Sequence, residues 1–478
     1  MLLPLNEIIK NKKPDKMRFT IHRNMKTKLI FLLTVATVLF TSCNDDGIGT
    51  DEKYENLPDV TGYPIVGTNQ STSFDNSTII TKPSVGDTFY GQNSNYPGTT
   101  PRYEDNGDGT VTDMVTGLMW QQTLDHNGDG VIDYADKLTY DEILALPDTD
   151  TTADYTDWRV PTIKEQYSLM DFSGRDISGY EGTSTEELTP FINTAVFGYA
   201  YGDTDAGERL IDVQCASTNV SVGNMIEMVY GVNFADGRIK GYGTTMMGQA
   251  KAFNYLLVRG RTDYGINALS DNGDGTITDA ATELMWMQDD SGEGMTWQDA
   301  LSYAENTTFA EHSDWRLPDV KELQSILDYS RSPQTTASAA IDPMFNCTQI
   351  TNEAGEIDYP YFWSSTTHGN WTDGNEGAWG AYLSFGCAMG NESMPGMGEG
   401  GMPPMGGTPP DGGTPPDGVI PPDGELPDSG IINWIDVHGA GAQRSDPKVG
   451  DPANFPTGNG PQGDAIRIFN YIRLIRNI

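Results

Sequence analysis

The chain has 478 residues, a length that allows about two to four domains, each with a sizeable core. Its 29 Lys and Arg stand against 68 Asp and Glu, and the resulting net charge of −39 disfavours nucleic acid, anionic lipid and sulfated glycans as partners. Such a density of carboxylates suits divalent cations, although solubility alone also explains it. The four cysteines form no Cys-x-x-Cys pair and no Cys/His cluster, which disfavours a zinc site.

The amino-terminal segment has the composition of an export signal. Basic residues after Met25 precede an apolar run at 29–40, and the run ends at Thr41-Ser42-Cys43. The pattern resembles a bacterial lipoprotein signal, with Cys43 lipidated; a plain secretory signal or a membrane anchor is the alternative. Asn44-Asp45-Asp46 directly after the cysteine resembles the acidic surface-export signal of Bacteroidetes lipoproteins. We therefore expect a chain that is lipid-anchored in the outer membrane and exposed at the cell surface. Residues 1–42 enter no fold prediction, and 1–24 are open to being an over-extended start.

Residues 43–100 are rich in Thr, Ser, Asn, Pro and Gly. This composition predicts a flexible tether between the lipid anchor and the folded part.

The rest of the chain is one pattern written twice. Asp-Asn-Gly-Asp-Gly-Thr at 105–110 returns at 271–276, and Asp-Trp-Arg at 157–159 returns at 314–316. Between and after these blocks, Leu-Met-Trp occurs at 118–120 and 284–286, Ala-Ser-Thr at 216–218 is echoed by Ser-Ser-Thr at 364–366, and Phe-Asn-Tyr occurs at 253–255 and 469–471. The conserved order of the blocks predicts two tandem repeat domains, 101–262 and 263–478.

Local chemistry within each repeat predicts strands and short helices. Asn-Gly at 106–107 and 272–273 favours a hairpin turn, and the Thr-rich segments after it alternate as strands do. Behind Pro318, Asp319 and Glu322 have capping-box spacing, and apolar residues follow at helical spacing; the segment after Pro161 does the same. We expect an α+β fold with much irregular loop.

Residues 391–430 of the second repeat consist largely of Pro-Pro-Asp-Gly and Met-Gly-Gly units. These cannot bury much apolar surface, so a disordered insertion is predicted.

The ordered blocks are similar to the C-terminal domain family of the Legionella collagen-like adhesin, over about 101–262 and 263–478. That family occurs in bacterial secreted proteins, and its named member binds sulfated glycosaminoglycans. The Trp-Arg-Leu-Pro block also resembles one found in C-type-lectin-like domains, which implies two tandem domains of that fold. This chain departs from the adhesin because it lacks a collagen-like stalk and is strongly acidic. The resemblance therefore implies surface adhesion or glycan binding, and leaves the ligand open.

Residues 125–136 match the template of an EF-hand-type calcium loop. Glycine stands at its sixth position, where the loop must turn sharply. The predicted ligands are Asp125, Asn127, Asp129, Val131 through its carbonyl, Asp133 and Asp136. A solvated acidic turn is the alternative. The counterpart at 289–300 keeps Asp289, Ser291 and Glu293 but ends on alanine, so calcium is predicted for the first repeat.

Other conspicuous residues have structural interpretations that compete with functional ones. The aspartates of the first block, Asp105, Asp108, Asp113, Asp271, Asp274 and Asp279, suit capped turns better than metal ligation. Arg159 and Arg316 either grip an acidic ligand or pair inside the domain, and the second is commoner. Core positions are expected for Trp120, Trp286, Trp315 and Trp363. Cys347 and Cys387 are a candidate disulfide, which would leave Cys215 free.

No nucleophile motif and no singled-out carboxylate pair indicates catalysis, and His438 is isolated in the sequence. We therefore expect no enzyme, but an adhesin-like surface lipoprotein that binds an extracellular glycan or a host or matrix protein. A structural envelope component and an enzyme acting on extracellular polysaccharide are the alternatives.

Overall fold

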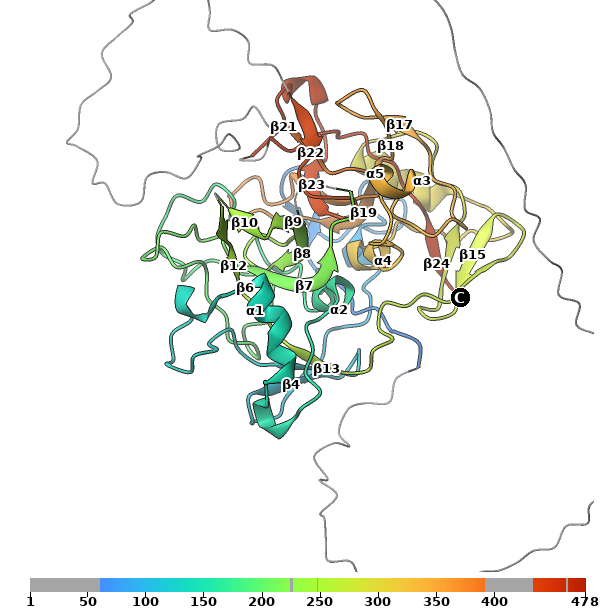
Figure 1. The fold of residues 1–478 in the computed structure, drawn as a ribbon. Coiled ribbons are helices and arrows are strands. Elements are labelled where there is room, and N and C mark those ends of the chain that lie inside the picture. The colour runs from blue at the N-terminus through green and yellow to red at the C-terminus, as the bar shows by residue number, and fades with distance from the viewer. Residues whose placement is uncertain (1–60, 224–226, 247, 392–432, 461–462) are drawn as a thin grey trace, which may run out of the picture. The chain divides into compact units, whose positions relative to one another are not determined.

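The computed structural model describes residues 61–223, 227–246, 248–391, 433–460 and 463–478, and the predicted lipidation site Cys43 and insertion 391–430, except Asn391, lie outside this part. Each repeat begins with a three-stranded antiparallel sheet that its own last strand completes (Figure 1). In the first repeat the strands are β3 (Tyr103–Asp105), β4 (Thr110–Asp113), β5 (Leu118–Gln121) and β13 (Val258–Gly260). In the second they are β14 (Leu269–Asp271), β15 (Thr276–Asp279), β16 (Leu284–Met287) and β24 (Ile475–Asn477).

A six-stranded antiparallel sheet joins the two repeats. The first repeat contributes β7 (Gln214–Val220), β8 (Met228–Asn233) and β9 (Arg238–Gly243), and the second contributes β19 (Tyr361–Thr367), β20 (Trp379–Ser384) and β23 (Gln443–Pro447). The order β19-β20-β23-β9-β8-β7 is the same read from either edge, with equivalent strands at equivalent places. The repeats meet where Gln443 of β23 pairs with Ile239 of β9.

The two predicted capping boxes start helices at the centre of the molecule. Helix α2 (Ile163–Ser168) begins after Thr162, whose side chain accepts from the backbone of Glu165, and α4 (Val320–Ser325) begins in the same way after Asp319. The two helices lie side by side against the six-stranded sheet (Figure 1). Every residue of α4 is buried, because the helix lies between its own repeat and the other one.

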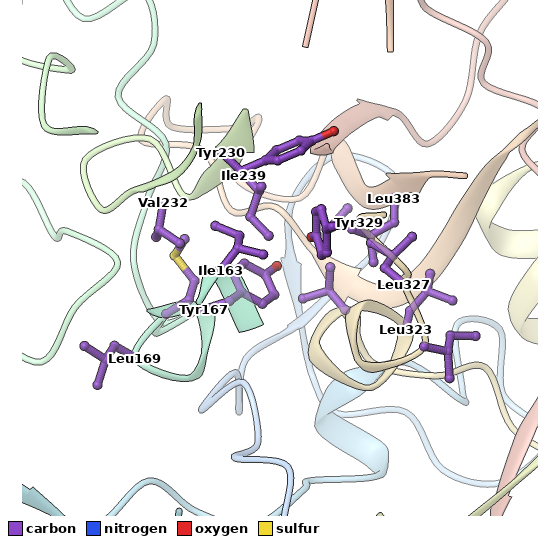
Figure 2. Close-up of a cluster of buried hydrophobic side chains, with 14 of the residues drawn as sticks. Ile163, Tyr167, Leu169, Tyr230, Val232, Ile239, Leu323, Leu327, Tyr329 and Leu383 are labelled. Carbon is purple, nitrogen blue, oxygen red and sulfur yellow. The ribbon is translucent and has the colours of Figure 1, made fainter. Parts of the chain in front are cut away.

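The main hydrophobic core fills the space between these helices and the sheet. Figure 2 shows Ile163 and Tyr167 near α2 and Leu323 and Leu327 near α4, with side chains of the sheet across from them. The sheet residues include Val232, Ile239 and Leu383, which come from both repeats. Burial of apolar surface from both repeats in one cluster stabilises them together.

Two lysines connect the helices by reciprocal hydrogen bonds, which we call the lysine exchange. Lys164 of α2 donates from Nζ to the carbonyl of Ser325, the last residue of α4, at 2.7 Å. Lys321 of α4 donates to the carbonyl of Ser168, the last residue of α2, at 2.9 Å. Each cation therefore caps the carboxyl end of the opposite helix, where free carbonyls and the helix dipole favour positive charge.

Residues 61–100 are packed into the fold, so the prediction of a flexible tether does not hold for them. Tyr63, Val66 and Phe74 are buried, and Gln70 donates to the carbonyls of Phe172 and Thr367, one in each repeat. This packing could not be predicted, because Tyr, Val and Phe are scattered among polar residues and make no periodic pattern. Residues 43–60 lie outside the described part.

The remaining elements are short. Among the described residues, the other α-helices are α1 (Tyr140–Ala145), α3 (Trp297–Asn306) and α5 (Pro333–Thr336), and the remaining helical turns are short 3-10 helices. Two-stranded pairs are formed by β1 (Ser73–Phe74) with β2 (Ile79–Ile80), β6 (Leu138–Thr139) with β12 (Ala252–Phe253), β10 (Thr245–Met246) with β11 (Gln249–Ala250), β17 (Ile350–Thr351) with β18 (Ile357–Asp358), and β21 (Met389–Asn391) with β22 (Trp434–Asp436).

The prediction of an α+β, C-type-lectin-like fold is wrong. Within the described residues the structure is mostly β, in small antiparallel sheets, and its longest α-helix, α3, has ten residues. The capping boxes and apolar stripes did mark helices, but α2 and α4 each stop after six residues. An apolar stripe is typical of a longer helix with one solvent-exposed face. Here the short helices are also covered by the other repeat, so the same stripe occurs without a long helix.

No helix within the described ranges is long and apolar enough to cross a membrane.

Candidate ligand-binding cavity

The arginines of the repeated Trp-Arg blocks stabilise the part that the two repeats share, which we call the frame: in each repeat, the four-stranded sheet and the helix that follows the Trp-Arg block. Arg159 forms a two-bond ion pair with Glu165 of α2, at 2.7 and 2.5 Å. Arg316 does the same with Glu322 of α4, at 2.7 and 2.6 Å. Because these carboxylates also belong to the capping boxes, each arginine fixes the start of a helix. The structural interpretation of both arginines is supported.

The repeated aspartates accept hydrogen bonds from their own turns. Asp105 accepts the amide of Gly107 at 2.8 Å, and Asp108 accepts the hydroxyl of Thr110 at 2.6 Å. Asp271 and Asp274 make the same two bonds in the second repeat. The tryptophans that were predicted to be core, Trp120, Trp286, Trp315 and Trp363, are all buried.

The predicted calcium loop closes through its own carboxylates. Asp125 accepts the amides of Gly128 and Gly130 at 2.8 and 2.9 Å, one on each oxygen. Asp136, which is buried, accepts the amides of His126 and Asn127 at 2.8 and 3.0 Å. Oxygen ligands of this kind suit calcium. A carboxylate oxygen that accepts a hydrogen bond from one amide N–H retains a second lone pair, which is free to bind an ion.

Convergence of these carboxylates on one point is not observed. In the described part of the chain, no three residues among His, Cys, Asp and Glu are grouped so that they could hold a metal ion. In the second repeat, Asp289, the counterpart of Asp125, and the adjacent Asp290 bond to a later segment of the same repeat: Asp289 accepts from Asn346, and Asp290 accepts from Thr348. Calcium at 125–136 remains a prediction.

The candidate disulfide is not formed. Cys347 and Cys387 both carry free thiols, as does the buried Cys215. Cys387 belongs to a small cluster with Met389 and Ala465, whereas Cys347 packs against the main core. The two cysteines share a repeat in the sequence but pack in different clusters.

A cavity of about 590 Å³ lies on the side of the six-stranded sheet opposite the helices. Arg238, Lys240 and Tyr242 alternate along β9 and line it, while Ile239 between them enters the main core. Tyr382 of β20 and its cross-strand partner Arg444 of β23 line it from the second repeat. The cavity therefore lies at the junction of the repeats, and its size is within the range of about 300–1,000 Å³ usual for small-ligand sites.

The cavity gathers positive charge in a chain that is otherwise acidic. Five basic residues line it: Arg209, Arg238, Lys240, Lys251 and Arg444. Arg238 pairs with Asp176 at 2.6 Å, and Lys240 pairs with Asp236 at 2.9 Å. The pKa of Lys240 is lowered to about 8: burial removes hydration from the charged form, and the charges of Arg444 and Arg238 act in the same direction, while Asp236 opposes them.

Comparison with known proteins agrees with the internal repeat. The model of the Lcl C-terminal domain matches residues 109–259 and again 275–397, which together exceed half of the chain. The chain belongs to the Lcl C-terminal domain family. One matched segment lies within each predicted repeat, which confirms the predicted family and the tandem arrangement. No curated protein and no solved structure matches the chain.

The basic residues that line the cavity do not belong to the sequence blocks that the two Lcl C-terminal domains share. Lys240 and Arg444 were missed in the sequence because they are far apart along the chain. One signal was available: Arg238-Ile-Lys-Gly-Tyr242 alternates cationic or aromatic residues with small or apolar ones, as a strand with one polar face does.

His438 was isolated in the sequence but has charged neighbours in the fold. Its Nε2 lies 3.1 Å from Asp464, which lines the cavity and also pairs with Arg444. Burial, and then the charge of Arg444, lowers the pKa of His438 to about 4, so it is neutral at pH 7. This buried cluster holds Arg444 in the cavity wall.

Proposed function

We propose that this chain is an adhesin-like binding protein that takes part of an extracellular ligand, a glycan or a host or matrix protein, into the cavity between its two repeats. The observation that carries the proposal is the 590 Å³ cavity, built by both repeats and lined by five of the chain's 29 basic residues. Membership of the Lcl C-terminal domain family supports an adhesin-like role. We propose binding in preference to catalysis, and a structural envelope role is the alternative.

Lipid attachment at Cys43 and exposure on the outer surface of a Bacteroidetes-type outer membrane belong to the same proposal. The basic and apolar segments before Cys43 and the acidic residues after it support them. Replacement Cys43→Ser should move the protein from the membrane fraction to the soluble fraction of the native host. Unchanged membrane retention would contradict lipid anchoring.

Calcium at 125–136 is also proposed, as an ion that stabilises the first repeat and does not contact the ligand. The oxygen donors of the loop support this proposal.

The binding role is tested on glycan arrays and panels of immobilised matrix proteins, probed with the full chain and with two variants. Thr204 is exposed and lines the cavity, so Thr204→Trp should place a ring at its mouth and abolish binding. Thr308 lies just after helix α3 in the second repeat, is exposed and does not line the cavity, so Thr308→Trp is the matched control. Binding that survives Thr204→Trp would exclude the cavity as the site, and silence on every surface would favour the structural alternative.

A further inference from the structure

The cations of the cavity differ in how far their charge is already balanced. Arg209 pairs with Asp212 at 2.7 Å, and Arg444 pairs with Asp464. With the pairs of Arg238 and Lys240 described above, four of the five cations have a carboxylate partner. Lys251 is the fifth cation.

Lys251 contacts aromatic rings instead of an acid. No ion pair involves its Nζ among the described residues, and the atom lies 4.7 Å from the ring centre of Tyr242 and 5.2 Å from that of Phe253. Burial lowers its pKa to about 8, and the charges of Arg209 and Lys240 oppose its protonation, while Asp212 favours it. Five cations and the four carboxylates Asp176, Asp212, Asp236 and Asp464 thus leave one positive charge in excess at the cavity.

Donor groups in the wall are also left without acceptors. The Nε atoms of Arg238 and Arg444 and the hydroxyl of Tyr242 are buried and make no hydrogen bond that meets geometric criteria within the described residues. All three residues line the cavity and are more than nine-tenths buried. Buried donors without acceptors cost free energy, and an acceptor group of a ligand would recover part of it where side chains of the wall move and expose the donor.

The remaining walls combine aromatic rings with amides and hydroxyls. Tyr180 and Trp379 are partly exposed, and the polar lining includes Gln214, Asn370 and Ser178. Sugars present both apolar ring faces and hydroxyl groups, so this mixture suits a sugar better than a purely apolar or purely ionic ligand.

We propose that the cavity binds a sugar that carries a single carboxylate, a uronic acid, with Lys251 as the counterion of the carboxylate. The inference rests on the proposed function and names the ligand class of the same site. One excess positive charge balances one carboxylate, whereas the net charge of −39 repels a polysulfated chain before it reaches the cavity. Either a terminal uronic acid of a glycan or the free sugar offers this chemistry.

The test is calorimetric titration of the full chain with glucuronate and galacturonate, with glucose and galactose as neutral controls and glucose 6-sulfate as the sulfate arm. A uronate should bind at least about tenfold more tightly than its neutral counterpart, the difference expected of one charge-assisted contact. A uronate-terminated oligosaccharide that binds while the free uronate does not would place the source in glycans and support the inference.

Variants then assign the contact to Lys251. Lys251→Met should lose about tenfold in uronate affinity, and Lys251→Arg, which keeps the charge, should retain most of it. Lys82→Met at an exposed lysine away from the cavity is the control, and melting curves show whether each variant is folded.

Equal binding of neutral sugars, tighter binding of the sulfate, or folded Lys251→Met with unchanged affinity would overturn the inference and leave the binding function standing. Failure of every uronate, free or in oligosaccharides, while another ligand binds in a Thr204→Trp-sensitive manner would also overturn the inference alone. Failure of all ligands on all surfaces would overturn the proposed function itself.

Discussion

The two repeats share a frame and differ in the segments attached to it. Arg159 and Arg316 make the same ion pair with a capping-box glutamate, and the first hairpins make the same turns. The segment after the first sheet differs: the acidic loop 125–136 of the first repeat bonds to itself, whereas Asp289, the counterpart of Asp125, accepts a hydrogen bond from Asn346.

The cavity extends this contrast. Four of its five cations, Arg209, Arg238, Lys240 and Lys251, come from the first repeat, and the second contributes Arg444. The repeated blocks therefore build the scaffold, and residues between the blocks build the sites. A family pattern that is matched twice therefore identifies both copies of the scaffold but not the residues that line the cavity.

The largest loss of stability is expected when an arginine of the frame is removed. Arg316→Ala should lower the free energy of unfolding by about 3–5 kcal/mol, because Glu322 is left as a buried, unpaired charge. Arg159→Ala should cost somewhat less, since the Arg159 side chain is 25% exposed and water can enter its place. Urea unfolding measures both, with Arg209→Ala at an exposed pair as a control expected to cost about 0–1 kcal/mol. A loss below about 0.5 kcal/mol for Arg316→Ala would mean that the repeats do not share this frame.

The two repeats are expected to differ in calcium binding at their acidic loops. If calcium binds at 125–136, saturation to a hundredfold above Kd should add about 2.7 kcal/mol to the free energy of unfolding. Melting in calcium and in chelator should show this gain in the wild type and in Asp289→Asn, and not in Asp125→Asn. An equal gain in Asp125→Asn would exclude this loop as the site.

The pH dependence of stability shows whether Lys164 and Lys321 make equivalent contributions to the two helices. Burial lowers the pKa of Lys164 and of Lys321 to about 8, so between pH 8 and the usual lysine pKa of 10.5 the folded state binds fewer protons than the unfolded state. Stability contributed by each lysine therefore rises with pH in this window, by at most about 1.4 kcal/mol per pH unit.

Lys164→Met and Lys321→Met should each flatten the rise by a similar amount relative to Lys82→Met, measured by urea unfolding from pH 8 to 10. A rise that persists in one variant and vanishes in the other would show that the exchange is not reciprocal.

Local features of the fold followed from the sequence, and long-range ones did not. The Asn-Gly turns at 106–107 and 272–273 and the capping boxes at Thr162 and Asp319 are short-range chemistry, and all of them are present. The pairing of Gln443 with Ile239 joins strands far apart in the chain, and no local pattern specifies it. The cavity follows from that pairing, so its lining could not be assembled before the sheet order was known.

Residues 61–100 give the molecule an unusual mechanical connection. They bond to both repeats: the amide of Tyr63 to the carbonyl of Ala281, Gln70 to Phe172 and Thr367, and the carbonyl of Asp75 to Lys448. A pull applied at the amino-terminal side of this segment therefore loads several hydrogen bonds in both repeats at once instead of peeling one repeat from its edge. For a protein held from that end while it grips a ligand, such shear loading would keep the cavity at the repeat junction intact under tension.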